Sequence, residues 1–401
     1  MNKAIYLPAL AEQFGSLWKR GLKYKGKDGK EYDMKCFTEN SHFNYPYGLQ
    51  SIYYAKEGVA KGCDNKDGNT FRNLIGYPKE ALLVTDSAGF QIASFKKKGE
   101  KCNITAIDSL RYQEANGNIM MQLDVPPNLD GKPSYHDFKE ALEESKKNFK
   151  VFEDNRKNFD ADLYNVLHGE TLTLLEEWYN EVKDFKNEGW AIGIKPPFDP
   201  MLQALGFLFL LEKGEYNKES CHGIHFFGTS GKHVVPTLVY CASKIKKENF
   251  RVTYDSSSYN IGSIFRTYYL PFDIGPHICF GDKFKRENPE LKELPCCCPV
   301  CRTIKDINEL NTTDIYAGTL ISLHNMYQYI QYNELLNSIV YNKERFIEYL
   351  NTINISDKCL KSIEFIDFAL ENGLKQAVKK YEEWLKPEEI NKAKQVSIFH
   401  F

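Results

Sequence analysis

The sequence predicts an α/β protein built on a (β/α)8 TIM barrel, and three observations lead to this fold. Short apolar or β-branched runs alternate with amphipathic stretches at a spacing of roughly 25–45 residues. Polar and acidic residues follow directly after these runs, as they do at the C-terminal ends of barrel strands. No glycine-rich phosphate turn follows an early run, which disfavours the alternative of an open doubly wound sheet.

The predicted strands and helices lie mainly in the centre of the chain. We expect strands at residues 81–85, 119–123, 163–167, 190–194, 224–227 and 252–254. Helical patterns occupy residues 135–155, 171–187, 234–247 and 315–336. The first 80 residues are aromatic and turn-rich, and we interpret them as the first barrel strands with insertions.

Length and composition exclude several classes of protein. With 401 residues, of which 42% are hydrophobic and 26% charged, the chain resembles a globular protein with a large core. Its net charge of −2 gives no global basic field, so a nucleic acid would have to be bound by a local patch. Because no apolar stretch of about 18 residues and no signal-peptide core occur, we expect no membrane partner and a cytoplasmic location.

Four of the eleven cysteines crowd into residues 296–301, which indicates a metal site in a reducing compartment. Cys296, Cys298 and Cys301 form a C-x-C-x-x-C pattern, and His324 follows in the next predicted helix. Three thiolates and one imidazole complete the tetrahedral shell of Zn²⁺ and leave no open position. The pattern therefore predicts a structural rather than a catalytic zinc.

The ligand set leaves alternatives open. Cys297 is a candidate to replace Cys296, and His222 and His225 are weaker rivals of His324 because they belong to a different, strand-like element. Buried reduced cysteines without a metal are a further alternative.

Three carboxylates each follow a predicted strand: Asp86, Asp124 and Asp255. A single carboxylate in this position is usually the N-cap of the next helix. Three of them at the strand ends of one barrel instead favour a shared active site, because the C-terminal ends of barrel strands meet at one mouth.

Six segments, in order along the chain, resemble the tRNA-guanine transglycosylase family. Residues 86–91 read Asp-Ser-Ala-Gly-Phe-Gln, similar to Asp-Ser-Gly-Gly-Phe/Tyr-Gln, and residues 123–126 read Leu-Asp-Val-Pro, similar to the Leu-Asp-Ile/Val-Pro stretch of archaeal members. Residues 166–169 stand where the family has Val-Gln-Gly, and residues 191–193 match its Ala-Ile-Gly. Residues 255–259 are similar to the archaeal nucleophile segment, and the cysteine motif ending in His324-Asn325 completes the series.

The resemblance implies a pentosyltransferase that exchanges guanine in a nucleic acid for a 7-deazaguanine. Asp255 would be the nucleophile that attacks C1′, Asp86 the acid and base, and Asp124 the acceptor for the N–H edge of the base. The matching motif positions add further substrate-binding residues: Phe90, Gln91, His168, Gly169 and Gly193. The implied cofactor is a structural Zn²⁺ on Cys296, Cys298, Cys301 and His324.

These features divide the chain into four expected segments. Residues 1–80 hold the N-terminal barrel strands and insertions, and residues 81–275 form the main barrel core with the active site. Residues 276–336 form a zinc-binding subdomain with the following helix, and residues 337–401 a Lys/Glu-rich helical segment that we interpret as a solvated cap.

Departures from the family pattern bear on the substrate. Ala88 replaces a Gly, His168 replaces a Gln, and residues 194–199 replace a Gly-Leu-Ala/Ser-Val-Gly-Glu loop. No RNA-binding domain of the archaeal kind is expected after the zinc site, so DNA is slightly favoured over tRNA. The expected partners are therefore DNA or tRNA and a 7-deazaguanine base such as preQ0 or preQ1, with a second copy of the chain or a separate subunit as a further candidate.

Two other functions compete with base exchange. One is a non-catalytic zinc-stabilised subunit that binds nucleic acid, although such a subunit has no need of Asp255. The other is a carbohydrate hydrolase with two barrel carboxylates, which has no need of the cysteine cluster. Two basic runs are candidate phosphate contacts or, as the more common case, solvated faces: Lys96–Lys98, and Lys283 with Lys285 and Arg286.

Overall fold

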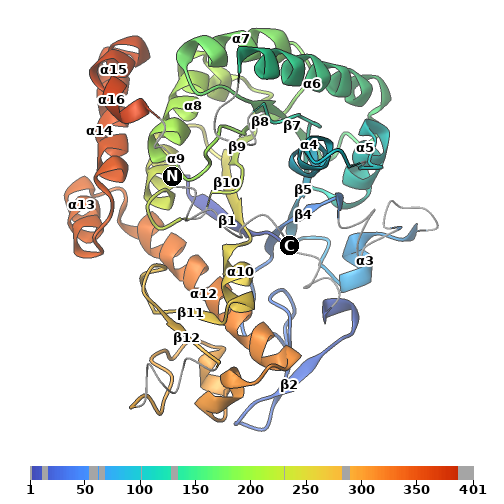
Figure 1. Cartoon of the computed structure of the whole chain (residues 1–401), viewed down its shortest axis with the longest axis vertical. Coiled ribbons are helices and arrows are strands. Elements are labelled where there is room, and N and C mark those ends of the chain that lie inside the picture. The colour runs from blue at the N-terminus through green and yellow to red at the C-terminus, as the bar shows by residue number, and fades with distance from the viewer. Residues whose placement is uncertain are drawn as a thin grey trace.

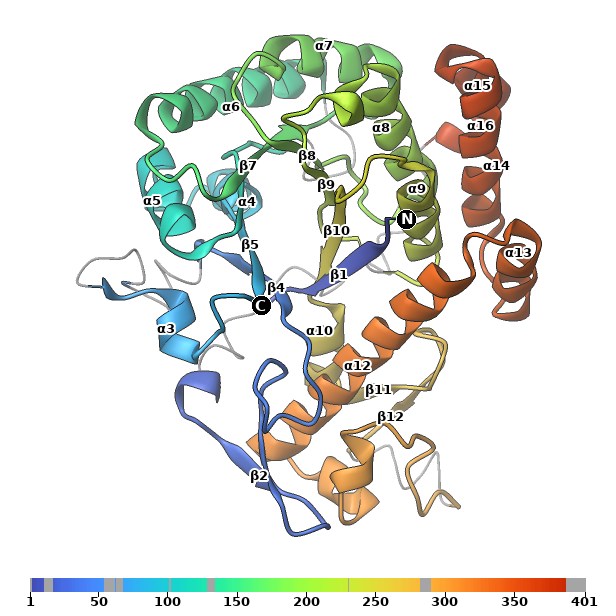
Figure 2. The same ribbon diagram turned by 180° about the vertical axis from the view of Figure 1, so that it is seen from behind.

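The computed structural model describes residues 2–10, 17–53, 62, 68–100, 102–127, 134–229, 231–281 and 290–386. A ring of strands is surrounded by helices, and hairpins and loops gather below it in the view of Figure 1. The reverse view shows the same ring, with a long helix crossing between the barrel and these loops (Figure 2).

Eight parallel strands form one sheet in the order β1-β10-β9-β8-β7-β6-β5-β4. The two edge strands meet through a parallel bridge between Ala9 and Leu49, next to a 2.7 Å hydrogen bond from the Leu10 N–H to the Leu49 carbonyl. The sheet therefore curls into a nearly closed barrel, which confirms the predicted fold class. The strands are β1 (Ala4–Pro8), β4 (Tyr47–Ser51), β5 (Leu82–Asp86), β6 (Ile119–Met121), β7 (Asp162–Leu167), β8 (Gly189–Ile192), β9 (Gly223–Phe226) and β10 (Arg251–Ser256).

Helices follow the strands and cover the outside of the barrel. Ser134 and Thr105 each begin a helix with a capping box. The side chain of the capping residue accepts a hydrogen bond from the backbone N–H of an aspartate three residues later, and the side chain of that aspartate accepts one from the backbone N–H of the capping residue. The predicted helix at 135–155 agrees with the observed one, whereas those at 171–187 and 234–247 are shorter than predicted. The helices are α3 (Phe71–Ile75), α4 (Gly89–Lys97), α5 (Ala106–Asn116), α6 (Tyr135–Asn155), α7 (Leu172–Val182), α8 (Pro200–Glu212), α9 (Val235–Lys244) and α10 (Ser258–Ile264).

Two insertions interrupt the strand–helix alternation. The hairpin β2 (Lys23–Lys25) with β3 (Glu31–Asp33) lies between the first two barrel strands, as the aromatic N-terminal region suggested. After α10, the hairpin β11 (Thr267–Tyr269) with β12 (His277–Cys279) and the cysteine loop precede α12 (Ile315–Ile339). The short 3-10 turns are η2 (Glu215–Asn217), η3 (Cys301–Thr303) and η4 (Ile307–Asn311).

Helix α12 joins the inserted part to the barrel. Tyr254 on β10 donates to the Asn333 side chain at 3.0 Å, and Asn337 both accepts from the Ala4 N–H and donates to the Ala4 carbonyl. These buried polar bonds anchor the helix on β1 and β10 at specific positions. None of the described helices combines the length and the apolar character needed to cross a membrane.

The C-terminal segment is helical, but it is not solvated throughout. Phe346 and Leu350 on α13 and Ile363 on α14 are fully buried, and α14 packs along α8 and α9. At this contact the buried Lys358 ammonium lies 2.6 Å from Asp199, which also caps the first turn of α8. The apolar side of this amphipathic pattern therefore packs against the barrel helices, and the prediction of a solvated cap was wrong for this side. The helices are α13 (Lys343–Thr352), α14 (Asp357–Asn372), α15 (Leu374–Lys380) and α16 (Glu382–Leu385).

Candidate active site at the barrel mouth and metal centre

The three predicted carboxylates meet at the C-terminal end of the barrel. Asp86 is the last residue of β5, Asp255 lies near the end of β10, and Asp124 follows β6. The charges of Asp124 and Asp255 both act on Asp86 and raise its pKa, so the three carboxylates lie near one another.

Asp86 has the ionisation that acid–base work at neutral pH requires. Burial, followed by the negative charges of Asp124 and Asp255, raises the pKa of Asp86 to about 7. Hydrogen bonds from the Ser51 hydroxyl and the Ala88 N–H oppose this rise by stabilising the carboxylate. The side chain can therefore hold or release a proton near neutral pH.

The turn after β5 brings a helix close to the second carboxylate. Ala88 adopts a left-handed conformation with φ of 69°, which costs a non-glycine residue about 1–2 kcal/mol. The resemblance implies a glycine at this position, and a glycine would adopt this conformation without strain. A Cβ on the next residue, Gly89, would lie 2.2 Å from the Asp124 carbonyl oxygen. Only a glycine lets these two segments approach so closely.

Asp124 is held by His168 rather than by solvent. The Nε2 atom of His168 lies 2.7 Å from Oδ2 of Asp124, and both side chains are buried. A Cβ on Gly193 would lie 2.4 Å from Cε1 of His168, so the glycine leaves room for the ring. Because a carboxylate only accepts, Nε2 must carry the proton in this pair. His168 thus orients Asp124.

Asp255 is held by a residue whose role the sequence did not reveal. His225, placed at the sequence level only among weak zinc candidates, lies with Nε2 3.2 Å from Oδ1 of Asp255, and its Nδ1 lies 2.9 Å from the Thr253 hydroxyl. The Gly228 N–H donates to the same Oδ1 at 2.8 Å. Among the described residues none forms a hydrogen bond with Oδ2. The sequence did carry one signal for this contact. Thr253 and Asp255 alternate along one strand and therefore point to the same face, and His225 is a polar residue on the neighbouring strand.

Lys195 is a second site residue that the sequence motifs did not identify. It follows β8 in the segment that departs from the family loop, and its ammonium lies 5.1 Å from the centroid of the Phe90 ring. Burial lowers the pKa of Lys195, and the charges of the three carboxylates raise it in part. A small pocket lies beside it, lined by Pro127, Phe138, His168, Gly169, Glu170, Leu174, Gly193, Ile194 and Lys195.

The remaining predicted substrate-binding residues surround the same mouth. Gly169 lines the small pocket with φ of 132°, and a Cβ there would lie 2.6 Å from the Leu175 nitrogen. Gln91 lies on α4, and its buried side-chain oxygen has no hydrogen-bond partner in the described structure. Both amide atoms of Gln122, two residues before Asp124, are likewise buried and without a described partner. Orphaned buried amides of this kind are typical of a site that holds water or ligand.

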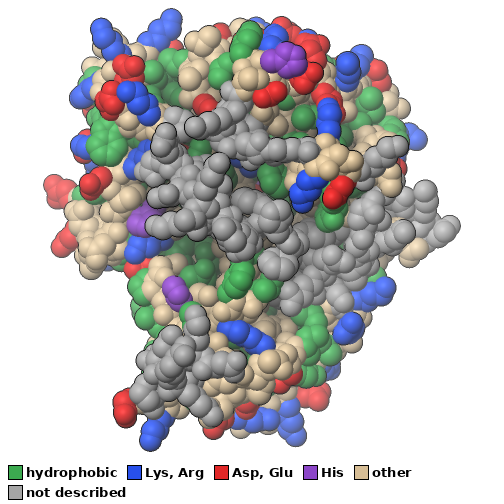
Figure 3. All heavy atoms as spheres, in the orientation of Figure 1, with side chains coloured by type: hydrophobic (Ala, Val, Ile, Leu, Met, Phe, Trp, Pro, Cys, Tyr) green, Lys and Arg blue, Asp and Glu red, His purple; other side chains and the backbone are tan. Residues whose placement is uncertain are grey.

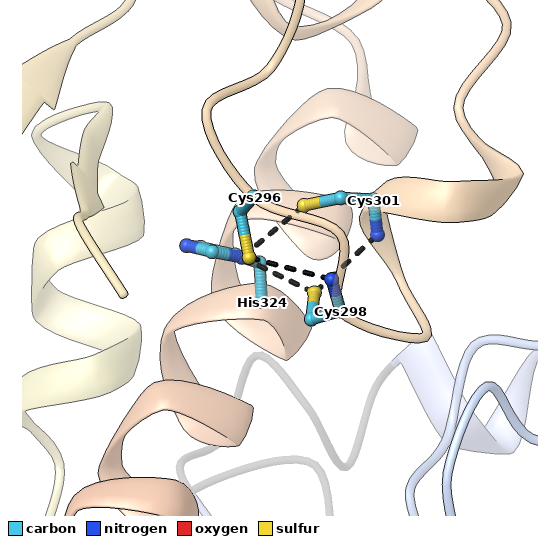
Figure 4. Close-up of side chains that lie close together, drawn as sticks. All are labelled: Cys296, Cys298, Cys301 and His324. Atoms are coloured by element: carbon cyan, nitrogen blue, oxygen red, sulfur yellow. Dashed lines mark hydrogen bonds between the residues drawn. The ribbon is translucent and has the colours of Figure 1, made fainter. Parts of the chain in front are cut away.

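The cysteine loop and α12 form the predicted cluster (Figure 4). The ligand atoms of Cys296, Cys298, Cys301 and His324 all lie within 4.8 Å of one another. The Nδ1 atom of His324 is 3.4 Å from the Cys298 sulfur and 3.3 Å from the Cys301 sulfur. In a tetrahedral zinc site a sulfur and a nitrogen are about 3.6 Å apart, so this donor set fits Zn²⁺. The cluster can hold a metal ion.

Neighbouring groups orient the donors and settle the choice among the cysteines. The Nε2–H of His324 donates to the Tyr269 carbonyl at 2.8 Å, so Nδ1 faces the thiols. The Tyr268 ring stacks on His324 with centroids 3.7 Å apart. Cys297 is exposed and lies outside the cluster, which favours Cys296 as the fourth donor. His222 is not a rival either, because it lies 2.8 Å from Asp162.

One lysine of the first basic run forms an ion pair on the surface. Lys96 lies 2.7 Å from Glu144, so its charge is already paired. On the face shown in Figure 3, described acidic and basic side chains alternate along the upper rim. Lys283, Lys285 and Arg286 lie outside the described residues.

Comparison with known proteins supports one family. No family model matches the chain. The tRNA-guanine(15) transglycosylase of Methanocaldococcus jannaschii is 22% identical to it over 260 residues. That match covers 63% of this chain but only 36% of the relative, so the chain spans little more than a third of that protein. The barrel and the cysteine–histidine cluster are the features that the resemblance implied, and together with this sequence similarity they support a relationship to the tRNA-guanine transglycosylase superfamily.

Proposed function

We propose that this chain exchanges a guanine base of a nucleic acid for a 7-deazaguanine, through a covalent intermediate between Asp255 and the sugar. The observation that carries the proposal is the placement of Asp86, Asp124 and Asp255 around one barrel mouth, each with different partners. Different surroundings give chemically similar groups different roles, as in retaining glycosidases.

In the first displacement, Oδ2 of Asp255 attacks C1′ while the bond from C1′ to N9 of guanine breaks. His225 and the Gly228 N–H hold Oδ1, so the other oxygen can be directed at the sugar. Asp86 in its protonated form gives its proton to the departing base, which leaves as neutral guanine. The product of this step is an ester between Asp255 and the sugar.

In the second displacement, the Asp86 carboxylate removes the proton from N9 of the incoming base. N9 attacks C1′, the ester bond breaks, and Asp255 is released as a carboxylate. Forming the ester removes the negative charge of Asp255, which is one of the groups that raise the pKa of Asp86. Asp86 therefore remains ionised more readily once the intermediate exists, which suits its second role.

The base itself would be recognised at the Asp124 edge. The N1–H and 2-amino groups of guanine are donors, and the carboxylate of Asp124 accepts from both. His168 supports that carboxylate from behind at 2.7 Å. Phe90, Gln91, Gly169 and Gly193 complete the walls, and the base must be flipped out of its helix or presented in a loop to reach them.

A Zn²⁺ ion on Cys296, Cys298, Cys301 and His324 would have a structural role. It would crosslink the cysteine loop to α12, whose buried bonds reach β1 and β10. All four donors come from the protein, so no position remains for substrate.

DNA is the nucleic acid that we propose first, because the chain departs from the family at the base pocket. tRNA is the second candidate, favoured by the similarity to the tRNA-guanine(15) transglycosylase of Methanocaldococcus jannaschii. The deciding experiment incubates the protein with radiolabelled guanine and either duplex DNA or tRNA. Incorporation into DNA alone supports the first, incorporation into tRNA alone supports the second, and incorporation into neither rejects base exchange.

A further inference from the structure

The ammonium of Lys195 lies in the candidate base pocket and has no hydrogen-bond partner among the residues that the structure describes. It lies 5.1 Å from the centroid of the Phe90 ring and lines the small pocket beside His168 and Gly193. Among the described residues, none forms a hydrogen bond or an ion pair with it. An ammonium has three donors and no acceptor, so a half-buried one is favourable only when acceptors are supplied to it.

Two other donors that line this pocket are already used. Nε2 of His168 donates to Asp124, so this N–H is not available to a ligand. The N–H of Gly193 donates to the Leu167 carbonyl at 3.0 Å as part of the sheet. Both of these N–H groups are therefore already used, whereas the Lys195 ammonium, among the described side chains that line the pocket, can still donate.

The edges of guanine differ in a way that this arrangement distinguishes. The N1–H and 2-amino groups are donors and match Asp124, whereas O6 is an acceptor that Asp124 would repel. A cation cannot face the 2-amino group, because both would donate. With the N–H edge on Asp124, O6 is the acceptor on the flank away from the sugar, and the Lys195 ammonium can donate to it.

We propose that Lys195 is a specificity-determining residue that donates a hydrogen bond to O6 of the base and so selects 6-oxopurines and their 7-deaza counterparts. This inference rests on the proposed function, which it deepens by naming the feature of the base that is read. It also explains how the pocket tolerates His168 in place of an amide. The imidazole supports Asp124, and Lys195, which follows the next strand, makes the contact to O6 instead.

The test is a binding cycle with free bases and no nucleic acid. Isothermal titration measures Kd for guanine and for 6-thioguanine, which keeps N1–H and the amino group but carries a sulfur that accepts weakly. The wild-type protein is expected to prefer guanine by at least about tenfold, as for a hydrogen bond to a charged group. In Lys195→Met, which keeps the length and the contact with Phe90, the preference is expected to fall to about one- to threefold.

Two further proteins serve as controls for the cycle. Lys213→Met removes another lysine that lies over an aromatic ring, 5.2 Å from the Phe209 centroid on an outer helix, and should keep the wild-type preference. Lys195→Arg retains a donor and should restore part of the preference. Equal preference in wild type and Lys195→Met overturns the inference while base binding, and with it the proposed function, stands. Failure of both bases to bind wild type rejects the proposed function itself.

Discussion

The imidazole of His225 lies 3.2 Å from Oδ1 of Asp255, and the Gly228 N–H donates to the same oxygen at 2.8 Å. Two donors on one oxygen fix the plane of the carboxylate, and in the proposed mechanism Oδ2 is the atom that attacks the sugar. The buried Thr253 hydroxyl, 2.9 Å from Nδ1, fixes the ring in turn. The proposed nucleophile is therefore positioned by a chain of side chains from two neighbouring strands.

This relationship predicts the effect of removing the imidazole that holds Asp255. His225→Ala should lower kcat for guanine exchange by about 10- to 100-fold, because an unheld carboxylate spends less time aimed at C1′. KM for the nucleic acid should change little, since His225 is fully buried. Steady-state kinetics measure both. An unchanged kcat in a folded variant would show that Asp255 needs no such support.

Asp255→Asn should abolish exchange and leave nucleic-acid binding within about twofold of wild type. The amide keeps the shape but cannot form the ester with the sugar. A denaturing gel should show a protein–nucleic acid adduct for wild type and none for this variant. An adduct that persists in Asp255→Asn would assign the nucleophile to another residue.

Asp86 links activity to a measurable pH dependence of stability. Its folded pKa of about 7 lies above the value of an unfolded aspartate, so the protonated form is favoured by folding. The stabilisation is complete below the unfolded pKa of about 4 and is lost as pH rises through about 7. Asp86→Asn should therefore unfold at a higher temperature than wild type at pH 8, by a few degrees, and the difference should shrink by pH 5.

Thermal unfolding across that pH range checks the Asp86 prediction. Asp162→Asn is a control, because this carboxylate pairs with His222 and Arg251 away from the mouth. A constant difference between wild type and Asp86→Asn from pH 5 to pH 8 would contradict the raised pKa.

Gly193→Ala should weaken base binding without touching a proposed catalytic group. The added Cβ would lie 2.4 Å from His168, so either the ring or the strand must shift, at a cost of about 1–3 kcal/mol in stability. Displacing His168 removes the support of Asp124, and Kd for guanine should rise about tenfold. Gly318→Ala, where the new Cβ meets only an arginine nitrogen at 4.0 Å, should leave guanine binding unchanged.

The metal centre is tested by two neighbouring cysteines. Cys298→Ala should lose the zinc and lower the melting temperature, whereas Cys297→Ala should keep about one zinc per chain, because Cys297 is exposed outside the cluster. Elemental analysis of purified protein gives the metal content. Equal zinc in both variants would remove Cys298 from the ligand set.

The sequence by itself determined the features that depend on local spacing. Alternating runs and amphipathic stretches predicted the barrel, because strand and helix periodicities differ. The C-x-C-x-x-C pattern with His324 predicted the cluster, because the reach of short side chains limits which cysteines can converge. The three aspartates were found because each directly follows a strand.

Only the tertiary structure decided which side chains meet across strands. His225 and Lys195 carry no motif, and their importance follows from Asp255 on a neighbouring strand and Phe90 on α4, which closure of the barrel brings near. Likewise, an amphipathic pattern shows that a helix has an apolar face but not what covers it, so the docking of α14 on α8 through Lys358 and Asp199 was missed. Local sequence specifies whether a segment forms a helix or a strand and on which side its apolar residues lie. Which residues far apart in the chain come into contact depends on how the whole barrel closes.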